Sequence, residues 1–139
     1  MSASRTLTVA MPVGSFFPTI GGAQVGLHNI AVRLISRGIR PVVIAPWRSW
    51  LALRKGAHKL PYDVVPLPPK LGRLLAAFPA TMFAIMDLYF TVLNWRYKFD
   101  FWHCTYGYPI GAAVLHYLGD RRKPGHLIRC VGDDIQMVP

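Results

Sequence analysis

The chain of 139 residues contains no glutamate, so its six acidic residues are all aspartate, against 16 lysines and arginines. The formal charge of +10 favours anionic partners such as phosphate esters, nucleic acid or an acidic membrane, although a cationic solvated surface explains it equally well. Cys104 and Cys130 are too few for a disulfide-dense scaffold and lack the spacing of a zinc site, so we expect reduced thiols and no metal. Charged residues make up 16% of the chain and hydrophobic residues 53%, which excludes an intrinsically disordered protein.

Uninterrupted apolar runs long enough for a membrane span are also missing. Residues 74–95 are mostly apolar, but Pro79 and Asp87 interrupt them, and the longest uncharged piece is shorter than the ~20 residues that a span needs. Residues 7–13 are too short for a signal peptide and lack a small-residue cleavage site. We therefore expect a cytoplasmic protein, either free or attached peripherally to the inner face of the membrane.

Apolar, β-branched runs alternate with segments of helical periodicity along the chain. The strands are expected over residues 6–12, 41–45, 62–66, 99–105 and 126–131, and the helices over 23–37, 71–97 (with a break near Pro79) and 110–118. This alternation predicts an α/β domain with a doubly wound, mostly parallel, Rossmann-like sheet.

Ligands of such sheets bind beyond the carboxyl ends of the strands. Gly21 and Gly22 lie there, directly before the first helix. Without Cβ atoms their backbone could approach a ligand, and the helix N-terminus could bind an anion; alternatively, the loop simply needs positive φ angles. Asp100 begins its strand and is expected at the opposite edge.

Two common nucleotide-binding patterns are missing from these loops. No G-x-G-x-x-G follows the first strand, and Ala45, Pro46 and Trp47 stand where a ribose-binding acid would be expected. No P-loop G-K-[ST] sequence occurs. These absences argue against a nicotinamide cofactor and against a P-loop nucleotidase.

Three segments in order resemble glycosyltransferase family 4, whose members have the GT-B fold: PTIGGAQVGLHNIAVRLISRGIRPVVIAP, FDFWHCTYGYPIGAAV and RCVGDDIQ. The resemblance implies transfer of a sugar from a nucleotide-sugar co-substrate to a glycan or lipid-linked acceptor, with no other cofactor. The paired-glutamate motif of the family's C-terminal half is missing. Residues 1–139 therefore look like the N-terminal, acceptor-side half of a GT-B enzyme, incomplete at its C-terminus and inactive or nearly so without the donor-binding domain.

The resemblance also suggests site residues. His103 matches the first histidine of an H-x-H pattern and is the catalytic candidate, although it could equally be a core histidine. Thr105 takes the second position, where many members have histidine; it can hydrogen-bond a sugar but cannot titrate. Asp134 matches the aspartate of G-x-D-I, although it could instead cap a turn. The expected substrate contacts are Gly21, Gly22, Gln24, Thr105, Tyr106, Arg129 and Asp134.

Residues 47–60 suggest a separate membrane contact. As a helix they would be basic on one side and aromatic on the other, which is typical of helices that lie on anionic bilayers. An ordinary surface helix packed on the sheet explains them as well. The expected contact residues are Trp47, Arg48, Trp50, Arg54 and Lys55.

A noncatalytic basic α/β module, binding an anionic membrane or a phosphate-bearing partner, is the alternative to the transferase. Nucleic acid is not expected as a partner, because no helix-turn-helix, RNP or zinc-finger pattern supports it.

Overall fold

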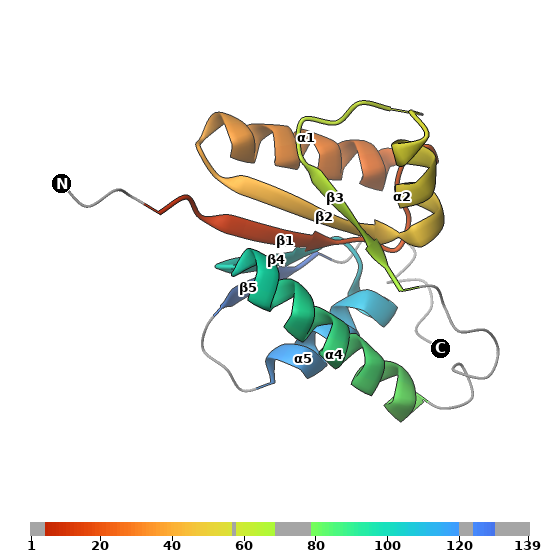
Figure 1. The fold of residues 1–139 in the computed structure, drawn as a ribbon, viewed down its shortest axis with the longest axis vertical. Coiled ribbons are helices and arrows are strands. Elements are labelled where there is room, and N and C mark those ends of the chain that lie inside the picture. Colours follow the sequence, from red (N-terminus) through yellow and green to blue (C-terminus); the bar gives the residue numbers. More distant parts are fainter. Residues whose placement is uncertain (1–4, 57, 69–78, 120–123, 130–139) are drawn as a thin grey trace.

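A computed structural model describes residues 5–56, 58–68, 79–119 and 124–129 of the chain. Its centre is a five-stranded, all-parallel sheet with the order β3-β2-β1-β4-β5 (Figure 1). The strands are β1 (Thr8–Pro12), β2 (Arg40–Pro46), β3 (Asp63–Leu67), β4 (Phe101–Cys104) and β5 (Gly125–Ile128). The helices are α1 (Gly22–Ser36), α2 (Trp47–Arg54), α4 (Pro79–Tyr97) and α5 (Ala112–Leu118), and a π-helical turn, Gly107–Gly111, leads into α5.

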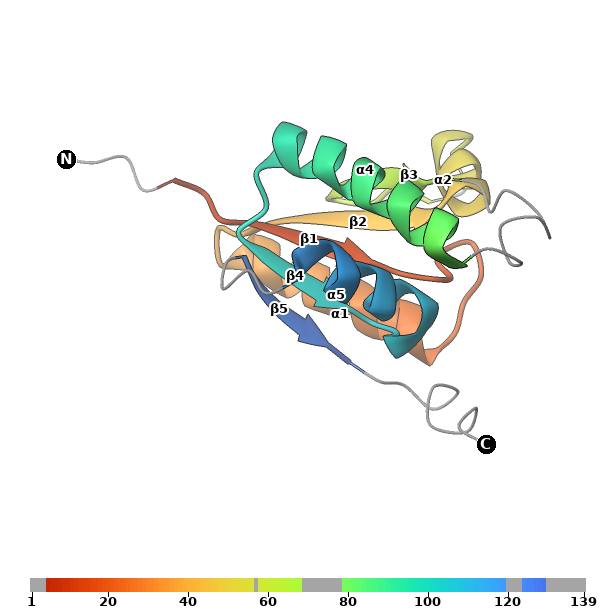
Figure 2. The same ribbon diagram turned by 90° about the horizontal axis from the view of Figure 1, so that it is seen from below.

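Helices cover both faces of the sheet (Figures 1 and 2). Val43 and Ala45 of β2 point into the layer below α1, together with Leu27 and Ala31 of that helix. Val42 and Ile44 point the other way, toward α4 and α5. Because both faces are covered, a continuous apolar run suits β2, as expected for a buried parallel strand.

Aromatic rings fill the core below α4 and α5. Trp102 of β4 is fully buried and contacts Phe90, Phe99 and Tyr117, with ring centroids 5.1 to 5.6 Å apart. The arrangements are edge-on or tilted, as aromatic pairs prefer. This cluster joins α4, α5 and β4 into one packed layer.

The predicted doubly wound parallel sheet is confirmed, and each strand overlaps its predicted region, with ends that differ by at most three residues. Asp100 also lies at the edge expected for it: its carboxylate accepts a hydrogen bond from the Thr8 backbone N–H (2.9 Å) and pairs with Arg5 (3.0 Å). It therefore joins the beginnings of β4 and β1, and has a structural role.

Two helix predictions need correction. The helix considered over residues 47–60 ends at Arg54, because Gly56 follows with a φ of +92°. The helix predicted from residue 110 begins as α5 at Ala112, after the π-helical turn. For the helix predicted over 71–97, α4 confirms the part from Pro79 onward; residues 71–78 lie outside the described residues.

Within the described parts of the chain, no helix combines the length and hydropathy needed to cross a bilayer. The part of the apolar segment 74–95 that is described belongs to α4.

Candidate functional site

The parallel strands bring several of the predicted site residues to one edge of the sheet. The loop before α1 follows β1, Thr105 and Tyr106 follow β4, and Arg129 follows β5. The ring of Tyr106 (Cδ2) lies 3.8 Å from the position that a Cβ would occupy at Gly14. The loops after β1 and β4 are therefore in contact at this edge.

Neither glycine of the Gly21-Gly22 pair has a positive φ angle. The alternative interpretation, that the loop needs glycine there for positive φ angles, is therefore wrong. Gly21 is the residue before α1 and has an extended backbone (φ −158°, ψ 174°), and Gly22 is the first residue of the helix. In the described chain, the glycines with positive φ are Gly38, Gly56 and Gly119. A Cβ at Gly22 would have no described atom within 4 Å, so contacts among these residues do not require glycine there. The backbone at the start of α1 is therefore open to a close approach from outside.

Gln24 lies over this helix N-terminus. Its side chain is buried, and Oε1 is 2.7 Å from the position that a Cβ would take at Gly21. The glycine at 21 thus leaves room for the amide of Gln24 to fold back. An amide can both donate and accept hydrogen bonds, which suits contact with hydroxyl or phosphate oxygens.

His103 is the third residue of β4 and is only 7% exposed. Its neighbours Trp102 and Cys104 point into the core below α4 and α5, so His103 points to the α1 side, because side chains alternate along a strand. Burial lowers the pKa of His103, and the positive charge of Arg129 lowers it further. The imidazole is therefore neutral at neutral pH.

Two buried polar atoms next to this edge have no hydrogen-bond partner among the described residues: Nδ1 of His103 and Oγ1 of Thr105. Thr105 is 2% exposed. Buried polar atoms are nearly always paired, so unpaired ones require an explanation, and a ligand hydroxyl is one. The indole Nε1 of Trp102 also has no partner among the described residues. Trp102 belongs to the aromatic core on the other face of the sheet, so this atom is not part of the site.

Arg129 brings positive charge to the same place. Its backbone N–H donates to the carbonyl of Cys104 (2.8 Å), and its Nη1 lies 3.8 Å from the position that a Cβ would occupy at Gly26 of α1. The guanidinium therefore lies against the first half of α1, whose N-terminus carries a positive partial charge of its own. Arginine and helix N-terminus together favour an anion at this edge.

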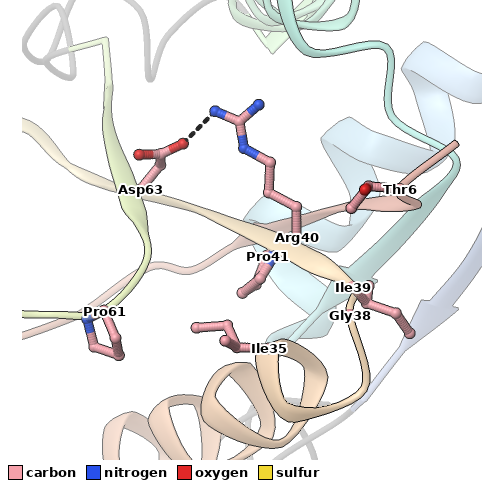
Figure 3. A pocket seen from close by; sticks show the side chains of 8 residues that line it. All are labelled: Thr6, Ile35, Gly38, Ile39, Arg40, Pro41, Pro61 and Asp63. Atoms are coloured by element: carbon pink, nitrogen blue, oxygen red, sulfur yellow. Dashed lines mark hydrogen bonds and ion pairs between the residues drawn. The ribbon is translucent and has the colours of Figure 1, made fainter.

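The hollow drawn in Figure 3 lies elsewhere. Its volume is about 480 Å³, and Thr6, Gly38, Arg40 and Asp63 line it at the amino ends of the strands. Arg40 and Asp63 form an ion pair across its wall (2.5 Å). This hollow is therefore at the opposite edge from the site residues.

A model of glycosyltransferase family 4 matches residues 20–128, which is more than half of the chain. The chain belongs to glycosyltransferase family 4. The match begins immediately before the diglycine and ends with β5, so it includes α1, β4 and the elements between them. Neither the curated proteins nor the solved structures gave a match.

Of the predicted substrate contacts in this family 4 chain, Asp134 lies outside the described residues. Gly21, Gly22, Gln24, Thr105, Tyr106 and Arg129 lie at the carboxyl edge, either in the loops after the strands or in the first turn of α1. His103 lies beside them within β4. The structure therefore brings these residues together at one edge of the sheet.

The predicted membrane contacts lie on α2. Trp47, Arg48, Trp50 and Arg54 belong to the helix, and Lys55 caps its C-terminus. Trp50 is half-buried, and the guanidinium of Arg54 stacks over its ring at 5.0 Å. Leu53 of α2 packs on the core below α1, so α2 is on the same side of the sheet as α1.

The sequence reasoning missed the steric role of Gly111. A Cβ there would lie 2.6 Å from the carbonyl oxygen of Tyr106 and 3.1 Å from Cγ2 of Ile128. Gly111 therefore lets the π-helical turn close against the loop after β4 and against the end of β5. The P-x-G sequence was the available signal, but it did not reveal the neighbours.

The surroundings of His28 were also missed. Its Nδ1 is 2.8 Å from the hydroxyl of Tyr62, and its ring meets Phe17 edge-on. Burial raises the pKa of Tyr62, so its hydroxyl stays protonated. This contact ties α1 to the segment before β3.

Proposed function

We propose that this chain is the N-terminal, acceptor-side domain of a cytoplasmic glycosyltransferase, which moves a sugar from a nucleotide-sugar donor to a glycan or lipid-linked acceptor. The supporting observation is that the open N-terminus of α1 lies at the same edge as Arg129 and as two buried polar atoms, on His103 and Thr105, that have no partner in the described part of the chain. Family membership supports the reaction class, and it does not favour the noncatalytic basic module as the alternative.

The site residues would bind different parts of the substrates, each according to the chemistry of its groups. The N–H groups at Gly22 and the charge of Arg129 would bind phosphate oxygens of the donor or an anionic acceptor. Gln24, Thr105 and Tyr106 would hydrogen-bond hydroxyl groups of the sugar. His103, as a neutral imidazole, would either hydrogen-bond a sugar hydroxyl or carry its proton during transfer. Asp134 would add a further hydrogen-bond acceptor for hydroxyls.

Binding can be tested on the chain itself by NMR titration with a panel of nucleoside diphosphates and nucleotide sugars. We expect shifts at Gly22, His103 and Arg129 and no shifts at Gly38 or Asp63, which line the hollow of Figure 3. Shifts confined to Gly38 and Asp63 would contradict the site. The chain alone is expected to give little or no transfer, because the donor-binding half is needed; robust turnover would refute this division of labour.

Substitutions at Gly22 give a graded test. Gly22→Ala and Gly22→Val meet open space within the described chain, so both variants should fold. If a ligand approaches the backbone here, affinity should fall from glycine to alanine to valine. Unchanged affinity in Gly22→Val would show that nothing binds closely at the start of α1.

A further inference from the structure

The outer face of α4 is exposed and mostly apolar: it carries Ala84, Leu88, Val92 and Trp95, with Thr91 as the one hydroxyl among them. Leu88 is 68% exposed, Val92 52% and Trp95 80%. These residues follow one another at three- or four-residue spacing, so they form one stripe along the helix. A helix with apolar residues on all sides is normally covered on all sides.

Contacts on the other sides of α4 fix which side remains open. Phe90 and Leu93 pack into the core. Asp87 pairs with His116 of α5 on one flank (2.9 Å), and the Tyr89 hydroxyl donates to the Pro66 carbonyl of β3 on the other. The outer face therefore points away from the described part of the chain. In Figure 2 the helix α4 lies in front of the sheet, next to α5.

Positive charge lies at the C-terminal end of this stripe. Arg96 and Lys98 are exposed, and the guanidinium groups of Arg96 and Arg40 both lie over the ring of Tyr97, at 5.6 and 5.4 Å. The sole acid within the α4 sequence is Asp87, which is engaged with α5. An apolar stripe that contains tryptophan, is bordered by cations and lacks an acid is complementary to an anionic lipid surface.

We propose that the outer face of α4 rests on an anionic lipid bilayer, with Leu88, Val92 and Trp95 in the acyl–headgroup boundary and Arg96 and Lys98 at the lipid phosphates. The contact is peripheral. It leaves the carboxyl edge of the sheet open, because that edge is formed by loops at the strand ends and not by the side of α4. The inference goes beyond sugar transfer and does not depend on it.

This surface differs from the one suggested by the sequence. The predicted contact residues of α2 lie on the α1 side of the sheet, and α4 lies on the other (Figures 1 and 2). One flat membrane cannot contact both sides together. The side chains also differ, since Trp50 of α2 is half-buried below Arg54, whereas Trp95 of α4 is free to insert.

Vesicle flotation of the full chain tests the proposal. We expect binding to phosphatidylglycerol vesicles, weaker binding at high salt, and little binding to phosphatidylcholine vesicles. Leu88→Gln/Val92→Gln should reduce partitioning about tenfold or more, because it removes apolar surface from the contact. The matched control is Val32→Gln/Ile35→Gln on α1, whose side chains are 40% and 37% exposed, and it should bind like the wild type.

The charges are tested separately. Each of Arg96→Gln and Lys98→Gln should weaken binding about fivefold at low salt, equivalent to ~1 kcal/mol for a basic residue near the surface. Thermal unfolding of every variant checks that the loss is not caused by misfolding.

Three results would overturn the proposal. The first is that the wild type fails to bind anionic vesicles. The second is that Trp47→Gln/Trp50→Gln on α2 abolishes binding while the α4 variants retain it. The third is that sedimentation shows a dimer that Leu88→Gln/Val92→Gln dissociates, since a second copy would then occupy the outer face of α4.

Discussion

The two faces of the sheet use their long helices differently. On one face, α1 buries an aliphatic stripe and presents its N-terminus, with Gly22 and Gln24, at the site edge. On the other, α4 buries aromatic residues and leaves a second apolar stripe exposed along its side. Thus α1 has its unused hydrogen-bonding groups at its end, and α4 has its exposed apolar area along its side.

The largest expected effect separates the two sides of α4 itself. Phe90→Ala removes a fully buried ring that contacts Trp102 and Tyr117, and should lower the free energy of unfolding by about 3–5 kcal/mol. Leu88→Ala, two residues earlier on the exposed side, should change it by less than about 0.5 kcal/mol. Urea denaturation measures both. A loss at Leu88 as large as at Phe90 would mean that the outer face is covered.

Gly111 and Gly22 differ in the space around them: an added Cβ would meet close neighbours at Gly111 and none within 4 Å at Gly22. Gly111→Ala puts a methyl group 2.6 Å from the carbonyl oxygen of Tyr106 and should destabilise the protein by about 1–3 kcal/mol. Gly22→Ala meets open space in a helix and should be neutral, or stabilising by up to about 1 kcal/mol. The same urea experiment compares them, and the reverse order would show that the two backbone environments have been misassigned.

The buried histidine makes the α1 face sensitive to pH. The pKa of His103 is lowered in the folded state, so the unfolded chain binds its proton first as the pH falls below about 6.5. Stability from neutral His103 is present above that pH and is lost toward the folded-state pKa, by at most about 1.4 kcal/mol per pH unit. Unfolding at pH 7.5 and 5.5 should show a smaller loss in His103→Gln than in the wild type. Equal losses would indicate that His103 is freely solvated.

The smallest effect is expected at the next residue, which points to the other face. Burial raises the pKa of the Cys104 thiol to about 12, so the reactive thiolate is scarce at pH 8. Mass spectrometry after an iodoacetamide pulse should find Cys104 unmodified in the native protein and alkylated in urea. Rapid native alkylation would show that the core below α5 opens.

The fold could be predicted because its signals are local. The apolar run PVVIA (residues 41–45) predicts a strand that is buried on both faces. Gly38, which has a φ of +73°, marks the end of the preceding helix. The diglycine and the histidine strand could likewise be assigned to one edge, because parallel strands end together. The position at which α2 ends was harder to predict from the sequence, because it depends on the positive φ angle that the backbone adopts at Gly56. The tight fit at Gly111 could not be predicted, because its neighbours Tyr106 and Ile128 are brought together by the sheet.

The sequence by itself determined the alternation of strands and helices, the excess of positive charge and the membership of family 4, since these follow from the order and chemistry of the residues. Tertiary structure alone decided that Arg129 lies against α1. It also decided that, among the described residues, His103 is buried with no partner for Nδ1 and one side of α4 is left uncovered. An apolar residue looks the same in the sequence whether a neighbour covers it or not. Phe90 and Trp95 are only five residues apart in the sequence. The packing of elements that are distant along the chain buries the ring of Phe90 in the core and leaves the ring of Trp95 on the surface.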